Sequence, residues 1–433
     1  MKTSLIIIIL LIGMTHTILF GEDVYLKITS KAPEQIKCTV IDFYNEDQNL
    51  TSKSNFVEIL KKDLNYSIFL DILDSCECEN GIISEVDQID YHCLGNQNVQ
   101  VVVWGKFTEL NQTKGRVELY LQSVAFSQTI LKRKYEGERD NLRYIAHTVA
   151  DDIVKQLTGE WGIANTKILF VSDRTGNKEL YMCDYDGLNI TQLTDYNSIT
   201  LFPDISMDNS KILFTSFIQG HPKLFLAEYP EFKHRTIAEF QGQNGPASFS
   251  PDGKKIALTL SKDGNAEIYI MDLRTKRLER ITYNWGIDTS PCWSPTGKQI
   301  AFTSDVSGSP QIYTINSDGT NMKRLTYIGN YNDQSSWSPR GDQIAYCSRV
   351  DNRFNIVSIS VDGTSPVLLT SEGDNQNPSW SPDGYYLTFS SNRKGIYQLY
   401  QMNYQATDLR TISFSGPDHK PVWSNRYNWK FAK

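Results

Sequence analysis

Between residues 165 and 424, short runs in which apolar and polar residues alternate are separated by turn residues at regular intervals. Alternation with a period of two is typical of β-strands with one buried face, whereas an amphipathic helix shows a period near 3.6. No long helical period interrupts this region. The pattern predicts an all-β array for the larger part of the chain.

One motif, an aromatic residue followed by Ser-Pro-Asp-Gly or a variant, recurs through this array. Clear copies occupy 249–253, 293–297, 337–341 and 380–384, and degraded copies begin at Ile205 and Trp423. Their first residues are 44, 44, 44, 43 and 43 positions apart. A period of about 40–45 residues is typical of four-stranded propeller blades. The aromatic residue belongs to the inner strand, and Ser-Pro-Asp-Gly forms the turn to the second strand because Pro presets φ and Gly accepts a positive φ.

The fourth strand of each blade is marked by an apolar residue followed by Thr. These pairs are Leu193-Thr194, Ile281-Thr282, Leu325-Thr326 and Leu369-Thr370.

The two ends of the array complement each other. The first unit, 167–194, has strands two to four but no inner strand before it, whereas the last unit has an inner strand at 421–424 and little after it. We expect the C-terminal strand to complete the first blade, because this pairing removes two open sheet edges. The sequence predicts a six-bladed β-propeller over 161–433.

Residues 22–160 show a different, mixed α/β pattern. Buried strands are expected at 36–43 and 99–105, and 117–121 alternates like a half-exposed strand. Two helices are expected from apolar faces with helical spacing, one at Phe56, Leu60 and Leu64, and one at Leu142, Ile145, Val149, Ile153 and Leu157. Gly159 fits a helix C-cap before the junction with the propeller. The fold class is therefore an N-terminal α/β domain followed by an all-β propeller.

Residues 1–21 have the features of a secretory signal peptide. Lys2 provides a positive start, an eight-residue apolar run extends from Leu5 to Ile12, and Gly21 precedes the expected cleavage. A helix that spans a bilayer needs about 20 apolar residues, so a membrane anchor is the less favoured alternative. We expect an exported protein without an integral membrane segment.

The charge argues against one class of partner. The formal net charge is −7 for the whole chain, and removal of the signal, which carries one Lys and no acid, makes it more negative. Because neutralisation of phosphates supplies most nucleic-acid affinity, nucleic acid is not an expected partner.

Three of the seven cysteines, Cys76, Cys78 and Cys93, cluster in the N-terminal region. An oxidising compartment permits one disulfide among them, for example Cys78 with Cys93. A metal site that includes His92 is the alternative, although the spacing fits no usual zinc motif. Cys183, Cys292 and Cys347 are expected to be small buried apolar residues.

A search for catalytic motifs gives no positive signal. The sequence has no Gly-x-Ser-x-Gly elbow and no phosphate-binding glycine loop, and its Asp-Gly pairs fit hairpin turns. His147 is expected to be a packing or surface residue, and Asp184-Tyr185-Asp186-Gly187 a turn rather than a carboxylate cluster. A calcium ion in the central channel stays open. We expect no enzyme, no cofactor and no metal site.

The segments that enter the inner strands crowd around one mouth of the channel in such a ring. They are short, polar and often contain Pro, which favours a rigid binding surface over the alternative of ordinary solvated turns. The candidate site residues at this mouth are Gln243, Asn244, Gly245, Pro246, Asp288, Thr289, Ser290, Gln334, Gln376 and His419.

Several segments together resemble the TolB family of periplasmic propellers from the bacterial Tol–Pal system. The resemblance covers nearly all of 22–433. Its most specific part is the helix and junction, 142–148, Asp151-Asp152 and 157–159, followed by Asp184-Tyr185-Asp186-Gly187 in the first blade.

The resemblance implies a monomeric, non-catalytic periplasmic scaffold that links the outer-membrane lipoprotein Pal to the inner-membrane protein TolA. Such a scaffold supports envelope integrity and constriction of the outer membrane in cell division. In the family, Pal binds the propeller mouth. Asn244, Gly245 and Thr289 match the family pattern, whereas Gln243 replaces a usual His, and Pro246 and Ser290 also differ.

The resemblance also implies that the segment after the signal binds TolA. This segment comprises Glu22, Asp23, Val24, Tyr25, Leu26, Lys27 and Ile28. Its apolar residues at 24, 26 and 28 alternate with Tyr25 and Lys27, which independently suits a strand added to a partner's sheet edge.

An exported propeller that binds a small ligand or a glycan is the alternative function. An aromatic-lined channel with convergent charges would favour it over a protein partner.

Overall fold

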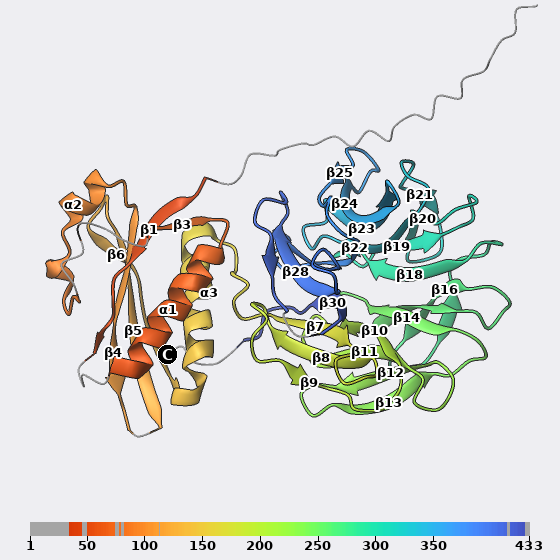
Figure 1. Cartoon of the computed structure of the whole chain (residues 1–433), viewed down its shortest axis with the longest axis horizontal. Helices are drawn as coiled ribbons and strands as arrows, with labels where there is room; N and C mark the ends of the chain where they lie inside the picture. The colour runs from red at the N-terminus through yellow and green to blue at the C-terminus, as the bar shows by residue number, and fades with distance from the viewer. Residues whose placement is uncertain are drawn as a thin grey trace, which may run out of the picture.

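The structure, a computed structural model, describes residues 34–45, 50–73, 78, 82–111, 113–413 and 416–428. An N-terminal α/β domain lies beside a β-propeller (Figure 1). The expected signal peptide, the segment 22–28 and Cys76 lie outside the described residues.

The N-terminal domain is built on one mixed sheet with the strand order β3-β1-β4-β5-β6, in which β2 also pairs with β4. The strands β1, β2 and β3 join the sheet in parallel, and β4, β5 and β6 are antiparallel. The three strands expected from the sequence are confirmed as β1, β4 and β5. The strands of this sheet are β1 (Ile36–Val40), β2 (Tyr44–Asn45), β3 (Leu70–Leu73), β4 (Val101–Glu109), β5 (Lys114–Ser123) and β6 (Gln128–Glu138).

Two long helices, α1 (Leu50–Tyr66) and α3 (Leu142–Thr158), lie side by side against one face of the sheet, with α3 toward the propeller (Figure 1). Both expected apolar faces are largely buried there. Gly159 ends α3 in the left-handed conformation with φ 80°, and its amide donates to Lys155 O at 2.9 Å. The predicted helix cap is therefore confirmed.

The other face of the sheet carries a smaller core under the short helix α2 (Tyr91–Asn96), where Leu94 packs with Val102 and Trp104. A disulfide joins Cys78 to Cys93 of α2, as expected from the cysteine cluster. Two single-turn 3₁₀ helices, η1 (Val86–Gln88) and η2 (Arg139–Asn141), complete the domain.

The propeller has six four-stranded antiparallel blades, as predicted. Blade 1 consists of β30 (Asp418–Trp423), β7 (Lys167–Ser172), β8 (Glu179–Asp184) and β9 (Thr191–Gln192). Blade 2 consists of β10 (Thr200–Ile205), β11 (Lys211–Ser216), β12 (Lys223–Glu228) and β13 (Lys233–Ala238). Blade 3 consists of β14 (Asn244–Phe249), β15 (Lys255–Leu260), β16 (Glu267–Asp272) and β17 (Leu278–Arg280). Blade 4 consists of β18 (Asp288–Trp293), β19 (Gln299–Ser304), β20 (Gln311–Asn316) and β21 (Lys323–Arg324). Blade 5 consists of β22 (Asn332–Trp337), β23 (Gln343–Val350), β24 (Arg353–Ser360) and β25 (Val367–Leu368). Blade 6 consists of β26 (Asn375–Trp380), β27 (Tyr386–Ser391), β28 (Gln398–Asn403) and β29 (Arg410–Thr411).

The ring closes through β30, which pairs with β7 from Asp418↔Ser172 to Trp423↔Ile168. The Trp423 indole donates a hydrogen bond to Thr166 Oγ1 at 2.8 Å. The C-terminal strand is thus the inner strand of the first blade, and the predicted closure is confirmed.

The apolar-Thr pairs have a role that the sequence analysis did not assign. They follow the short outer strands instead of lying within them, so the expected position is shifted by one or two residues. Each Thr hydroxyl is buried and accepts the amide of a residue in the third strand, as Thr282 does from Ile268 at 2.9 Å and Thr326 from Ile312 at 3.0 Å. The Thr hydroxyl therefore links the segment that follows the outer strand to the third strand of the same blade by a hydrogen bond.

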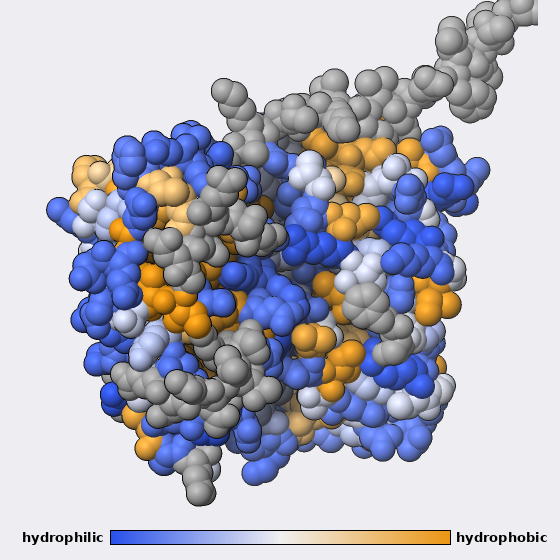
Figure 2. Space-filling view, turned by 60° about the vertical axis from the view of Figure 1, so that its left-hand side comes forward, coloured by the Kyte–Doolittle hydropathy of each residue, from blue (hydrophilic) through white to orange (hydrophobic). Residues whose placement is uncertain are grey.

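The two domains share one apolar core. Residues of α1 and α3 belong to the same buried cluster as Tyr185, Tyr386 and Trp423 of the propeller. Tyr66 stacks on Tyr386 with ring centroids 5.0 Å apart. On the side of the N-terminal domain, mainly hydrophilic residues cover the surface between separate hydrophobic patches (Figure 2). Among the described residues, no helix is long and apolar enough to cross a membrane.

Candidate functional site: the channel mouth

The six inner strands all begin at the same face of the propeller, which is the mouth of its central channel. The N-terminal domain contacts the opposite face, where the Tyr386 hydroxyl, just after a Ser-Pro-Asp-Gly turn, accepts a hydrogen bond from Ile68 N at 2.8 Å. The mouth is therefore free of contacts with the N-terminal domain residues that the structure describes.

A cavity of about 190 Å³ opens at this mouth and is lined by residues of all six inner strands. One residue per blade, the third of its inner strand, lines the opening. We call these residues the channel ring: Phe202, Pro246, Ser290, Gln334, Asn377 and Lys420.

Five of the six channel-ring residues have a left-handed backbone. Their φ angles are 54° for Phe202, 54° for Ser290, 58° for Gln334, 55° for Asn377 and 48° for Lys420. Few non-glycine residues adopt this conformation, which costs roughly 1–2 kcal/mol each. Each inner strand also has a register shift at this point. The fold therefore holds a repeated, strained bend at the mouth, and such bends cluster at functional sites.

Blade 3 reaches the same bend in another way. Proline fixes φ near −65° and cannot be left-handed, and the positive φ of 96° falls instead on the preceding residue, Gly245. A Cβ on Gly245 would lie 2.3 Å from Thr215 Oγ1. Gly245 is therefore required for the backbone conformation of this bend, and it has no side chain that a partner could contact.

Three of the residues expected from the sequence, Pro246, Ser290 and Gln334, line the mouth cavity. Gln376 and His419 lie beside it and are half-buried against Tyr397: the Gln376 amide donates to the Tyr397 hydroxyl at 3.2 Å, and the His419 ring lies 5.0 Å from the tyrosine ring.

Two other expected residues are also half-buried at the mouth. Gln243 donates from its Nε2 to Gly245 O at 3.0 Å. The Thr289 hydroxyl accepts from Thr259 at 3.4 Å.

The expectation that Asn244 lies in an exposed loop at the mouth is wrong, and the candidate residue Asp288 is not exposed there either. Both are buried first residues of inner strands. The Asn244 amide donates to the carbonyls of Pro222, Phe240 and Gly242 and accepts from Phe240 N at 2.8 Å. These side chains therefore hold the preceding segment in place and are not available to a partner.

Charged groups lie partly shielded from water in this mouth. The ammonium of Lys420 sits 3.9 Å from the centre of the Phe202 ring, and burial lowers the pKa of Lys420 to about 8. Burial raises the pKa of Asp204, another lining residue, to about 7. Asp333 accepts from the Thr303 hydroxyl at 2.7 Å and from Gln334 N at 2.6 Å.

Sequence reasoning missed a group of exposed apolar residues on the same face. They lie in the segments that lead into β18 and β22, and we call them the aromatic rim: Tyr283 (74% exposed), Trp285 (73%), Ile287 (53%) and Tyr327 (70%). Arg280 stacks on Tyr283 at 4.7 Å and Arg324 on Tyr327 at 4.8 Å. The signal was present, because Tyr283 and Tyr327 lie one repeat apart and each follows an apolar-Thr pair.

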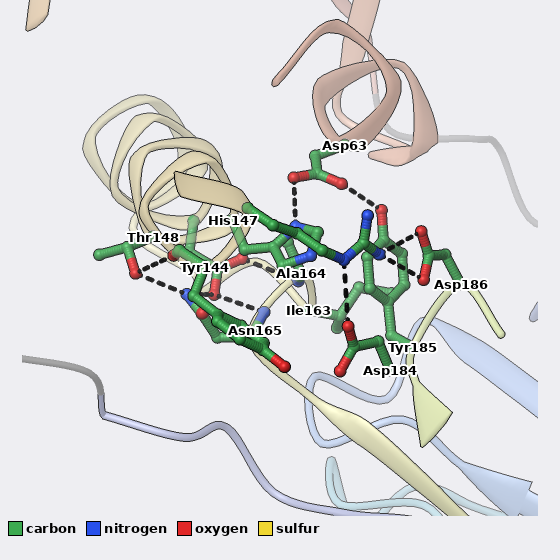
Figure 3. Close-up of polar contacts among 12 residues, drawn as sticks. Asp63, Tyr144, His147, Thr148, Ile163, Ala164, Asn165, Asp184, Tyr185 and Asp186 are labelled. Atoms are coloured by element: carbon green, nitrogen blue, oxygen red, sulfur yellow. Dashed lines mark hydrogen bonds and ion pairs between the residues drawn. The ribbon is translucent and has the colours of Figure 1, made fainter. Parts of the chain in front are cut away.

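A second polar cluster joins the domains on the far side from the mouth (Figure 3). Asp63 of α1 accepts from the Tyr185 hydroxyl at 2.6 Å and contacts Nδ1 of His147 at 2.6 Å. Arg143 of α3 binds Asp184 at 3.1 Å and Asp186 at 2.6 Å.

The contacts of this cluster add detail to the expectations for the Asp184–Gly187 turn and for His147. The Asp184–Gly187 segment is a turn, as expected, because Gly187 N donates to Asp184 O at 2.9 Å, but its carboxylates also hold the N-terminal domain. His147 is a buried packing residue whose ring takes part in the contact between domains. Burial alone would lower the pKa of His147, but the Asp63 carboxylate outweighs burial and raises it. No group of three His, Cys, Asp or Glu residues that could hold a metal occurs in the described parts of the chain.

Comparison with known proteins places the chain among relatives with the same two domains. The family model for the TolB amino-terminal domain matches residues 24–130, and the model for the TolB β-propeller domain matches 154–426. The crystal structure of TolB from Acinetobacter baumannii superposes with a TM-score of 0.80 and 28% identity, covering 92% of this chain and 98% of that one.

Curated relatives match over shorter stretches. The Tol-Pal system protein TolB of Geobacter sulfurreducens is 36% identical over 204 residues, which is 46% of each protein. The TolB homolog of Chlorobaculum tepidum is 48% identical over 81 residues, which is 19% of each. In these matches the chain spans less than half the length of the curated relatives.

Proposed function

The chain belongs to the TolB β-propeller family, and from this premise we propose that it is an exported scaffold of a Tol–Pal system. In this proposal the propeller mouth binds a Pal-like outer-membrane lipoprotein, and the chain works in the periplasm without catalysing a reaction. The segment Glu22 to Ile28 binds a TolA-like inner-membrane protein, so that one molecule connects the two membranes.

The observation that carries the proposal is the combination of the channel ring and the aromatic rim on the free face of the propeller. Tyr, Trp and Arg are enriched where protein interfaces gain most of their binding energy. Trp285 is 73% exposed, and the two tyrosines of the aromatic rim, Tyr283 and Tyr327, are each stacked by an Arg side chain. A rigid surface of this kind loses little conformational entropy when a partner binds.

Two observations argue against a catalytic cysteine and against a small-molecule site at the mouth. The thiol in the channel, Cys292, has its pKa raised to about 12 by burial, whereas a reactive cysteine needs a lowered pKa. The cavity of about 190 Å³ is smaller than the roughly 300–1,000 Å³ of typical small-molecule pockets. A protein partner therefore fits the mouth better than a small ligand or a glycan.

The mouth can be tested with matched variants of one blade. Ser290→Arg places a long charged side chain in the channel ring, and Thr296→Arg places the same group on the opposite end of β18 in an exposed turn. Burial of an unpaired charge at an interface costs several kcal/mol. We expect Ser290→Arg to weaken binding of the soluble domain of Pal from the same organism at least about tenfold, and Thr296→Arg to leave it unchanged.

Melting temperatures of both variants should stay within a few degrees of the parent protein, which separates loss of binding from loss of folding. Full binding by a folded Ser290→Arg variant would overturn the mouth as the site. Equal loss from both variants would do the same.

The N-terminal segment is tested by deleting residues 22–28 from the mature protein. Because an added strand binds through its backbone, we expect binding to the C-terminal domain of TolA to be lost while binding to Pal and the melting temperature persist. If TolA binds the shortened protein with unchanged affinity, the segment is not the TolA site.

A further inference from the structure

Lys420 differs from three other shielded cations of the propeller domain. Arg174, Lys167 and Arg426 each pair with a buried carboxylate, at 2.7 Å to Asp418, 2.6 Å to Asp184 and 2.9 Å to Asp151. The ammonium of Lys420 makes no salt bridge or hydrogen bond to any part of the chain that the structure describes, and its one assigned contact is the face of the Phe202 ring.

An ammonium that is partly removed from water without a carboxylate partner is unfavourable. The fold nevertheless fixes it there, because Lys420 has a left-handed backbone between β-bonded neighbours and is followed by Pro421. An aromatic face compensates the ammonium only in part, since a cation–π contact contributes about 0.5–2 kcal/mol. The Lys420 ammonium is therefore a positive charge at the mouth to which an anion can bind.

The groups around this charge favour a carboxylate from outside. The side chain of Gln334 accepts Asn377 N at 2.9 Å through its oxygen, which leaves its Nε2 as a donor at the opening. Asp333, the carboxylate that raises the pKa of Lys420 against the larger effect of burial, already receives two hydrogen bonds. Asp204 is partly neutral near pH 7 because burial raises its pKa to about 7.

The size of the opening limits what can enter. Its volume of about 190 Å³ is below the roughly 300–1,000 Å³ of typical small-molecule pockets. A space of this size suits the end of one inserted side chain.

From these observations we propose that Lys420 receives the carboxylate of a single Asp or Glu side chain, which the protein partner inserts into the channel mouth. The inference rests on the proposed function, because it names the group by which the partner is recognised at that site. The partner's carboxylate gains a charge-assisted hydrogen bond from Lys420 and a second donor from Gln334.

The test uses the mature protein with two substitutions at one position, and the soluble domain of Pal as the probe. Lys420→Met keeps the length of the side chain and removes the charge, whereas Lys420→Arg keeps the charge. We expect Lys420→Met to weaken binding about tenfold or more and Lys420→Arg to retain most of it. The melting temperature of Lys420→Met should be equal to or higher than that of the parent, because an unpaired shielded charge is removed.

A double-mutant cycle identifies the inserted group. Each Asp and Glu of the Pal domain is changed to Asn or Gln, and binding is measured against the parent and against Lys420→Met. One substitution should weaken binding to the parent about tenfold and have no further effect on Lys420→Met.

The inference and the proposed function fail in different ways. If Ser290→Arg abolishes binding but Lys420→Met binds like the parent, the mouth is the site and the carboxylate inference is overturned. It is also overturned if no acidic residue of Pal couples to Lys420. If Ser290→Arg binds like the parent, the proposed function itself fails.

Discussion

At the scale of single residues, the mouth is built on a repeated left-handed bend, which five of the six channel-ring residues adopt. Loop polarity correctly selects the region of Pro246, Ser290 and Gln334. It does not single out Phe202, Asn377 and Lys420, which lie in the same kind of segment. Phe and Lys are not residue types associated with the left-handed conformation that Phe202 and Lys420 adopt. That conformation comes from the repeated register shift of the inner strands, a tertiary feature that no local pattern reports.

The same limit explains the error at Asn244. The run Gly242-Gln243-Asn244-Gly245-Pro246 predicts an exposed turn. The structure instead buries the Asn244 side chain, which makes three hydrogen bonds to the preceding segment and one to the carbonyl of Pro222. Whether a short polar side chain meets solvent or backbone depends on the path of a neighbouring loop.

We therefore expect the Asn244 side chain to contribute to the stability of the fold and not to partner binding. Asn244→Ala leaves a buried amide and three carbonyl groups without their partner, so we expect the free energy of unfolding to fall by about 2–3 kcal/mol. Urea titration measures this loss, and Gln241→Ala, an exposed position in the same segment, serves as the control with a change within about 0.5 kcal/mol. An Asn244→Ala variant as stable as the control would contradict the assigned hydrogen bonds.

The His147–Asp63 contact gives a pH dependence with a defined sign. The folded state raises the pKa of His147 above its ordinary value of about 6.5. Its protonated ring therefore stabilises the fold fully below pH about 6.5, and this contribution is lost as the pH rises through the raised pKa. Arg143 opposes the shift and Asp186 supports it.

We expect the stability difference between the parent and His147→Gln to be largest near pH 5–6 and to shrink toward pH 9, because Gln can bond Asp63 but does not titrate. Urea unfolding across this range provides the measurement. The exposed His92, changed to Gln, is the control. A difference that grows with pH would show that the His147 ring is neutral in the folded protein.

At the scale of elements, the repeat explains why so much was predictable. The Ser-Pro-Asp-Gly turns and the two-residue alternation report local conformation directly, and Gly159 marks the end of α3 for the same reason. The short elements β2, β3 and α2 carry no such signal. They depend on the sheet around them and, for α2, on the Cys78–Cys93 disulfide.

Because β30 closes the ring, its removal should lower the thermal stability of the protein. Ending the chain before Asp418 removes β30, exposes the edge of β7 and takes Trp423 out of the core shared by both domains. We expect the melting temperature to fall by more than about 10 °C or the cooperative transition to disappear, since burial of such a side chain contributes about 3–5 kcal/mol. Calorimetry gives the readout.

A peptide comprising residues 416–428 is the matched control for this truncation. Added in excess, it should restore part of the lost stability, because it can pair with β7 as β30 does. A truncated protein that melts like the parent would contradict the closure.

At the scale of the whole molecule, the two faces of the propeller have different surroundings. The N-terminal domain is fixed to one face of the propeller by a continuous apolar core and by the Arg143 and Asp63 contacts. The other face carries the channel ring and the aromatic rim, and it has no contact with the N-terminal residues that the structure describes. In the function proposed above, this arrangement lets one partner bind the mouth without displacing the N-terminal domain.

Hydrogen exchange of the mature protein with and without the soluble domain of Pal tests this account most directly. If the mouth is the binding face, the backbone amides of 283–290, 327–334, 375–377 and 418–420 should become protected in the complex, while the turns at 251–254, 295–298 and 339–342 on the opposite face exchange as before. Protection confined to those turns or to the N-terminal domain, with no change at the mouth, would contradict the central claim.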